Sequence, residues 1–409
     1  MANMVDYLAW RGEFGLELTP WNEVDALLFA TLSYLNFHGT DNALGWTLAE
    51  AERLELLNEA TDSYFEKRKK MFLAMAESRR FGDCRMHHYI AETDLEKEMQ
   101  FSAVCYDLPD NTLVVAFRGT DSTVIGWRED LNMSLLKPVP AQEAAKTYLE
   151  HAAGMDDRPI RLTGHSKGGN LAAYAAACVS PEIQDRIREV YTFDGPGMSP
   201  DVFQSEGYRN IAPKIRSYVP QTSIVGMMME YHRNYTVVHS DAAGIQQHDP
   251  LTWQVYGPHF ECVESIDETA KTISDTLHDW LKLSDQEERA MFLDVAFGMI
   301  ESTRATTVSE IMGEKIRNLR SLISSGRDLD PERKKEFNRL LGVFLSAGVG
   351  NVIERGVGNV IEKYLPRKAE EKKGRVSQEE AAEAGDPAEP ASEAAENTSD
   401  IRQDENVSL

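Results

Sequence analysis

Cysteine is scarce in this sequence. Only 4 of the 409 residues are cysteine, and Cys84, Cys105, Cys178 and Cys262 lie far apart along the chain. No two of them form a C-x-x-C pair, so the common zinc and dithiol redox motifs are excluded. The sequence therefore predicts free thiols in a reducing compartment rather than a disulfide framework. We expect neither a metal nor a cofactor.

Positive charge is also in short supply. Lysine and arginine number 43 against 67 aspartates and glutamates, which gives a formal net charge of −24. A chain this acidic is poorly suited to bind a nucleic acid or to be drawn by charge to an anionic membrane surface. We therefore expect no nucleic-acid partner.

Long apolar runs are missing as well. The most apolar late stretch, residues 340–350, falls short of the ~20 residues that a transmembrane helix needs. The opening Met-Ala-Asn-Met-Val-Asp-Tyr lacks the basic segment and apolar core of a secretory signal. These two absences predict a cytoplasmic protein without a transmembrane segment.

The middle of the chain alternates between helix and strand patterns. Apolar residues recur at three- and four-residue steps in residues 1–84, over 24–37 and 48–75, which predicts an N-terminal helical segment packing on the core. Residues 85–265 form the predicted α/β core, with a mostly parallel central sheet. Its expected elements are a strand hairpin at 100–106 and 112–117, helices at 141–153, 167–179 and 182–188, and strands at 159–163, 189–193, 214–219 and 234–239.

The remainder of the chain changes character twice. Residues 266–365 read as a C-terminal helical region, with Ser284-Asp-Gln-Glu287 as a capping box. Residues 366–409 are rich in charged and small residues with almost nothing apolar, which predicts a disordered acidic tail. A protein partner that binds through this C-terminal region remains an open alternative.

The most informative run is Gly164-His165-Ser166-Lys167-Gly168. It follows an apolar stretch and precedes a helix of small residues, which is the strand, sharp turn and helix of a nucleophile elbow. The turn exposes the serine hydroxyl above the sheet, and glycine is needed at both ends because a side chain there would collide with neighbouring backbone. We expect Ser166 to be a catalytic nucleophile.

A serine nucleophile needs a base and a group that orients the base. In this architecture the order along the chain is serine, acid, histidine. Asp194 follows the strand after the elbow and is the expected acid. For the base, His248 lies in a loop beyond the last strand, and His239 at the end of that strand is the alternative. His165 is read as a packed histidine whose side chain points away from the serine hydroxyl.

An acyl-transfer site also needs donors for the developing oxyanion. The backbone N–H of Lys167, directly after the nucleophile, supplies one. The loop after strand 112–117 supplies the other, since Gly119 allows close approach and Thr120 offers an N–H and a hydroxyl. His87 and His88, on an earlier strand, are read as structural.

Together these segments resemble the class 3 (fungal triacylglycerol-type) lipases. The matching residues are Phe117-Arg-Gly-Thr120, Trp127, Asp130 and Gly164-His-Ser-Lys-Gly-Gly169. The body of the chain is more similar still to the bacterial Mbeg-like hydrolases. That likeness rests on Asp6-Tyr-Leu8, Trp10-Arg-Gly12, Asn22-Glu-Val-Asp25, Asp194-Gly-Pro-Gly197, Val219-Pro-Gln221, Gln247-His-Asp249 and Trp253. The resemblance implies an α/β-hydrolase fold and a lipase-like site without fixing a substrate.

Two positions depart from the class 3 pattern. Class 3 lipases take their acid from a later strand, where this chain carries Ser223, so Asp194 is the acid that the chain retains. Lys167 stands where these lipases carry an apolar residue. Its cation could strengthen the oxyanion hole or pair with a substrate carboxylate, but we expect it to point into solvent.

The sequence therefore predicts a serine hydrolase of lipid metabolism that cleaves carboxylic esters of small molecules or lipids through an acyl-enzyme. Met227 and Met228, in the apolar run Ile224-Val-Gly-Met-Met-Met229, are expected to bind an acyl chain, although such a run also suits plain core packing. A thioesterase or acyltransferase with the same site, and a non-catalytic scaffold on the hydrolase fold, are the alternatives.

Overall fold

The computed structural model describes residues 2–41, 43–60, 64–120, 129, 133, 138–223, 225–227, 229, 234–268 and 271. Its helices are α1 (Met4–Arg11), α2 (Glu23–Leu32), α3 (Leu48–Arg53), α4 (Phe65–Glu77), α6 (Pro140–Gly154), α7 (Lys167–Cys178), α8 (Pro181–Arg186), α9 (Pro200–Phe203) and α10 (Glu206–Ile211), with short 3₁₀ turns η1 (Ala212–Lys214), η2 (Val225–Met227), η3 (Gly244–His248) and η4 (Pro250–Thr252). None of these helices has the length and apolar character needed to cross a bilayer.

Nine strands of the described chain form one sheet in the order β1-β2-β3-β4-β5-β6-β7-β8-β11. Their bounds are β1 (Trp46–Thr47), β2 (Arg85–Asp94), β3 (Met99–Asp107), β4 (Leu113–Phe117), β5 (Ile160–His165), β6 (Ile187–Phe193), β7 (Ile215–Pro220), β8 (Tyr235–Val238) and β11 (Cys262–Val263), and β9 (Val255–Tyr256) pairs with β10 (His259–Phe260) separately. β2, β3 and β4 are antiparallel neighbours, whereas β4 to β8 run parallel. Antiparallel strands followed by a parallel series, with the elbow after β5, define the predicted α/β-hydrolase fold.

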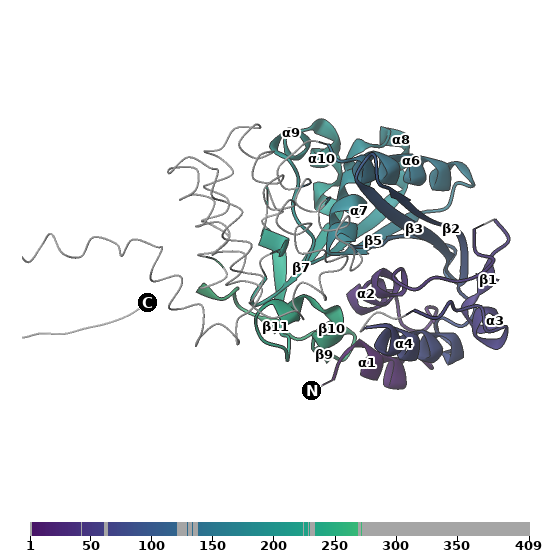
Figure 1. Ribbon diagram of the computed structural model, residues 1–409. Coiled ribbons are helices and arrows are strands. Elements are labelled where there is room, and N and C mark those ends of the chain that lie inside the picture. The colour runs from purple at the N-terminus through teal and green to yellow at the C-terminus, as the bar shows by residue number, and fades with distance from the viewer. Residues whose placement is uncertain are drawn as a thin grey trace, which may run out of the picture. The chain divides into compact units, whose positions relative to one another are not determined.

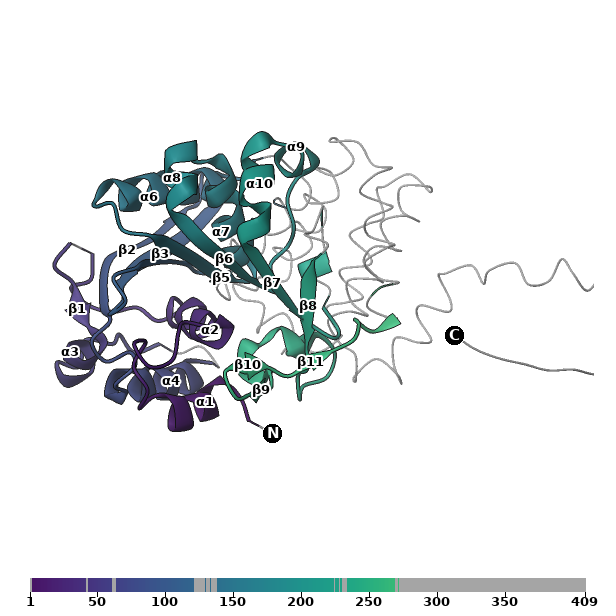
Figure 2. The ribbon, with the colours of Figure 1, turned by 180° about the vertical axis from the view of Figure 1, so that it is seen from behind.

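Helices cover both faces of this sheet. In Figures 1 and 2, α6 to α10 lie on one side, and α1 to α4 together with β9 and β10 lie on the other. Alternate residues of β4 serve the two layers: Val115 and Phe117 pack with the α6 and α7 side, while Val114 and Ala116 pack with α1, α2 and α4. This alternation follows from the two-residue period of a strand, and it gives the sheet two apolar faces.

Helices α1, α2 and α3 begin where local side chains can satisfy their free N–H groups. Asn22 caps α2, and Asp25 at the third helical position accepts from the backbone N–H of Asn22 in return. Asp25 is buried and forms an ion pair with Arg80. It also accepts a hydrogen bond from the Tyr7 hydroxyl at 2.7 Å. A buried charge is tolerated only when it is paired and hydrogen-bonded in this way. The network fixes α1 and α2 against the residues that precede β2.

One predicted helix differs from the structure. The helical spacing of apolar residues runs through residues 48–75 without a break, but the chain forms α3 and α4 separately. α3 is closed by a C-cap at Leu54, and Glu55 adopts a positive φ of 52° that a helix does not allow. Between the two helices, Leu57 forms an antiparallel bridge with Phe37, which precedes α3.

Candidate active site

Ser166 occupies a strained turn between β5 and α7. Its backbone angles, φ 58° and ψ −133°, lie outside the regions that ordinary residues favour. A Cβ on Gly164 would come within 2.1 Å of the carbonyl oxygen of Gly168, and one on Gly168 within 2.1 Å of that of Phe117. Both positions therefore require glycine. The geometry is that of a nucleophile elbow.

His248 lies between the serine and a carboxylate. Its Nε2 is 2.9 Å from Oγ of Ser166, and its Nδ1 is 2.5 Å from Oδ2 of Asp194. A carboxylate only accepts hydrogen bonds, so Nδ1 carries the proton and Nε2 presents its lone pair to the serine hydroxyl. The chain thus brings together three residues that are separated by up to 82 positions in sequence.

Asp194 directly follows β6 and is 1 % exposed. It has a positive φ of 47°, an unusual conformation that turns the chain at the carboxyl end of the strand. Its second oxygen, Oδ1, accepts from the hydroxyl of Ser223 at 2.5 Å and from the N–H of Gly226 at 3.1 Å. The carboxylate is therefore held on both oxygens, and its orientation toward His248 is fixed.

The other histidines considered from the sequence lie elsewhere. Nδ1 of His239 is 3.4 Å from a carboxylate oxygen of Glu261, in the segment leading to β11. His87 is buried on β2 with Nε2 2.9 Å from Oδ1 of Asp107, and its Nδ1 meets that of His88 at 2.6 Å. None of these contacts involves Ser166.

His165 points away from the serine hydroxyl and is packed and hydrogen-bonded. Its Nδ1 is 3.0 Å from the hydroxyl of Tyr34, and its Nε2 is 2.7 Å from the carbonyl oxygen of His248. Burial is the main reason that the pKa of the imidazole lies well below its usual 6.5, and the neighbouring charge of His248 lowers the pKa further. This link to the base was not predicted from the sequence, because nothing in the local pattern pairs Tyr34 or His248 with residue 165.

The expected oxyanion loop lies against the elbow. A Cβ on Gly119 would be 2.6 Å from the carbonyl oxygen of His165, so the loop after β4 touches the residue that precedes the nucleophile. Thr120 follows at this same edge and is half-buried. The backbone N–H of Lys167 begins α7 next to Ser166. Their role as oxyanion donors stays a prediction.

The expectation that Lys167 points into solvent is wrong. Its side chain is 1 % exposed, and Nζ donates to Glu129 at 2.8 Å and to the carbonyl oxygen and side-chain oxygen of Gln100 at 2.7 and 3.0 Å. Glu129 in turn accepts from the backbone N–H groups of Gln100 and Ala141. A fully satisfied acceptor site next to the elbow makes burial of this cation tolerable.

The residues expected to bind an acyl chain lie in the apolar run 224–229. Met227 is 2 % exposed and packs with Val219 and Val237. Its expected contact with an acyl chain stays a prediction. The residues outside the described chain are Met228, Ile224, Trp127, Asp130, the capping box 284–287, the helical region expected after residue 271 and the tail 366–409.

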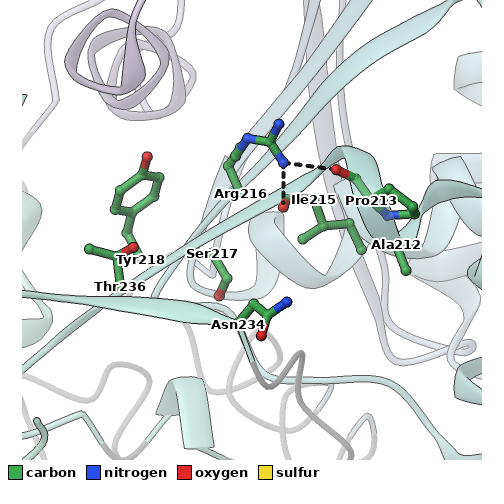
Figure 3. A pocket seen from close by; sticks show the side chains of 8 residues that line it. All are labelled: Ala212, Pro213, Ile215, Arg216, Ser217, Tyr218, Asn234 and Thr236. Carbon is green, nitrogen blue, oxygen red and sulfur yellow. Dashed lines mark hydrogen bonds between the residues drawn. The ribbon is translucent and has the colours of Figure 1, made fainter. Parts of the chain in front are cut away.

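A hollow of about 170 Å³ opens elsewhere on the described surface. Figure 3 shows its lining, in which the guanidinium of Arg216 donates to the carbonyl oxygens of Pro213 and Ile215. The hollow lies near the amino ends of β7 and β8, whereas Ser166 and Asp194 follow the carboxyl ends of β5 and β6. It is therefore separate from the candidate active site.

Solved structures that resemble this chain at low similarity include two that are named lipases. The M37 lipase has a TM-score of 0.34 and 17 % identity, over 49 % of this chain and 68 % of its own. A mutant form of MDLA from Penicillium cyclopium has a TM-score of 0.34 and 11 % identity, over 58 % and 83 %. The Rhizomucor miehei lipase propeptide complex has a TM-score of 0.26 and 16 % identity, over 39 % and 58 %. No curated protein matches the sequence.

The family assignment rests on sequence. The profile described as Mbeg1-like matches residues 75–298, which is more than half of the chain. The match spans the elbow, Asp194 and His248, and it confirms the membership expected from the sequence motifs. This chain belongs to the Mbeg1-like family.

Proposed function

We propose that the protein is a serine hydrolase that cleaves carboxylic esters through an acyl-enzyme intermediate. One observation carries the proposal: the imidazole of His248 bridges Ser166 and Asp194, at 2.9 and 2.5 Å from its two ring nitrogens. A nucleophile, a base and an orienting carboxylate within hydrogen-bond reach are the signature of activated serine.

The reaction would follow from this geometry in two halves. Oγ of Ser166 attacks the ester carbonyl carbon while its proton passes to Nε2 of His248. The oxyanion is met by the backbone N–H of Lys167 and by the N–H and hydroxyl of Thr120. When the tetrahedral intermediate collapses, the C–O bond to the alcohol breaks and the alcohol takes the proton from His248, leaving an acyl-serine.

The second half reverses these roles. His248 removes a proton from water as the water oxygen attacks the acyl carbon, and the serine oxygen leaves with that proton. The products are a carboxylic acid and free Ser166. Asp194 stays ionised throughout and stabilises the imidazolium that forms in each half. We propose a lipid-like ester as the substrate class, on the family resemblance and the apolar run around Met227.

The direct test is covalent labelling of the folded protein with a fluorophosphonate probe, followed by intact mass and peptide mapping. Label should appear on Ser166 and be absent from Ser166→Ala. Ser199→Ala is the matched control, since Ser199 precedes α9 and its side chain makes no capping bond. Hydrolysis of p-nitrophenyl esters of increasing chain length would then define the acyl preference. A folded protein that neither labels nor hydrolyses would contradict the proposal and favour a non-catalytic scaffold.

A further inference from the structure

The residue before the nucleophile links the elbow to the backbone of His248. The Nε2 of His165 is 2.7 Å from the carbonyl oxygen of His248, and the two rings lie 4.6 Å apart between centroids. His165 is 5 % exposed, and nothing in the reaction outlined above uses its side chain. A buried imidazole with this placement therefore needs an explanation of its own.

The protonation state of His165 follows from its partners. A carbonyl oxygen only accepts, so Nε2 must carry a hydrogen. Burial keeps the ring neutral, because it places the pKa of His165 well below its usual value. Nδ1 is therefore an acceptor, and the Tyr34 hydroxyl donates a hydrogen bond to it at 3.0 Å. Tyr34 thus selects the one tautomer of His165 that can donate to His248.

Tyr34 itself belongs to the N-terminal segment, just after α2. Its hydroxyl occupies the space next to Gly119, where a Cβ would come within 2.0 Å of it. On α4, the guanidinium carbon of Arg68 lies 4.3 Å from the centroid of the tyrosine ring, a cation–π distance. The phenol is therefore held between α4, the oxyanion loop and the elbow.

We propose that Tyr34 and His165 form a positioning pair that holds the backbone of His248 so that its imidazole stays at hydrogen-bonding distance from Ser166. The pair deepens the proposed hydrolase function and rests on it. Because Ser166 follows His165 directly in the chain, one residue fixes the nucleophile's backbone and the base's backbone together. A shift of the base by about 1 Å can cost on the order of a hundredfold in rate.

The neighbouring anchors of η3 are of a different kind. Gln247 accepts the N–H of Thr222 at 2.8 Å through its side chain, and its carbonyl accepts the indole N–H of Trp253 at 2.7 Å. Lys67 of α4 lies 3.8 Å from Asp249. These contacts hold η3 to the end of β7, to η4 and to the N-terminal segment. Only the hydrogen bond from His165, among the contacts named here, joins η3 to the nucleophile elbow.

The test compares three variants by steady-state kinetics on a p-nitrophenyl ester. His165→Leu removes the donor to His248, Tyr34→Phe removes the group that selects the tautomer, and His165→Gln keeps an amide N–H where Nε2 lies. We expect kcat to fall about 10- to 100-fold in His165→Leu and less in Tyr34→Phe, with KM nearly unchanged. His165→Gln should recover most of kcat.

Tyr148→Phe is the matched control. Tyr148 on α6 is buried and donates to the carbonyl oxygen of His88 at 2.7 Å, so its loss costs a comparable hydrogen bond that involves neither Ser166 nor His248. It should lower stability as Tyr34→Phe does and leave kcat unchanged. Nitrogen-15 spectra of histidine-labelled protein should show His165 protonated on Nε2 only and not titrating near neutral pH.

The outcomes separate the two proposals. If the unmodified protein neither labels with a fluorophosphonate nor hydrolyses esters, the proposed function fails. If the unmodified protein is active and His165→Leu keeps its kcat, or if His165 is protonated on Nδ1, the positioning pair is wrong. A variant that does not fold leaves the decision to the nitrogen-15 spectrum of the unmodified protein.

Discussion

The hydroxyl of Ser223 lies 2.5 Å from Oδ1 of Asp194, on the oxygen opposite the one that meets His248. Ser223 follows β7, and Asp194 follows the neighbouring parallel strand β6. Class 3 lipases, which this chain resembles, take their acid from the strand position that Ser223 occupies. The two side chains therefore meet at one spot beside the imidazole, although they come from different strands.

This contact leads to a prediction about the acid. Asp194→Asn should lower kcat by about three to four orders of magnitude, because an amide there favours the wrong tautomer of His248. The exchange Asp194→Ser with Ser223→Asp should recover at least tenfold over Asp194→Ser alone, since the Ser223 hydroxyl already lies 2.5 Å from Oδ1 of Asp194. Steady-state kinetics of the three variants check this. If kcat of the double variant does not exceed that of Asp194→Ser, a carboxylate at position 223 after β7 cannot replace Asp194 as the partner of His248.

The base assignment can be tested by comparing two histidines. His248→Ala should reduce turnover by several orders of magnitude, because Ser166 then has no proton acceptor. His239→Ala removes only a 3.4 Å contact with Glu261 and should leave kcat within about twofold. Ester hydrolysis assays on both purified variants provide the measurement. A larger loss in His239→Ala would contradict the role proposed for His248.

Backbone strain at Ser166 predicts that relieving the strain stabilises the protein at the expense of activity. Ser166 has φ 58° and ψ −133°, a region that glycine enters at little cost. Ser166→Gly should therefore raise the free energy of unfolding by about 1 kcal/mol while abolishing hydrolysis. Ser166→Ala, which keeps the strain, is the control and should match the unmodified protein in urea denaturation. Equal stability of the glycine and alanine variants would argue against strain at this turn.

Acid should weaken the fold through His165. The pKa of its buried imidazole lies well below 6.5, so below pH 6.5 the unfolded chain binds a proton that the folded chain does not. Stability from this group is full above pH 6.5 and falls as the pH drops, by at most about 1.4 kcal/mol per pH unit. Urea denaturation at about pH 8 and about pH 5 should show a smaller loss in His165→Gln. The same loss in both proteins would contradict the prediction.

Lys167 should matter for stability because its partner is buried. Lys167→Met leaves Glu129 as an unpaired buried charge and should cost about 3–5 kcal/mol. Adding Glu129→Gln removes that charge and should recover most of the loss. Thermal and urea unfolding of the single and double variants measure the coupling. An unchanged stability in Lys167→Met would mean that the pair contributes nothing.

Local patterns predicted the elements of the sheet well. The hairpin of β3 and β4, the strand and helix around Ser166 and the later parallel strands all have short-range signatures, namely a two-residue period, turn residues and small helix residues. Chain order also placed Asp194 and His248 at the same edge as Ser166. Their catalytic roles remain predictions.

Other features had no local signature. The bond between Tyr34 and His165 joins residues 131 positions apart, and burial of Lys167 depends on Glu129, 38 positions away. A cation beside a turn looks like a surface residue until its acceptors are known. The break between α3 and α4 was missed because apolar spacing continued through a segment that forms a bridge to Phe37 instead.

The packing of α1, α2 and α4 on one side of the sheet also determines which fragments of the protein can fold. Val104, Tyr106, Val114 and Ala116 are almost fully shielded from solvent beneath these helices, and the carbonyl oxygen of Ala2 accepts the N–H of Val255 at 2.8 Å. A shortened polypeptide starting at residue 85 would expose that apolar surface to water. Such a fragment should therefore aggregate on expression.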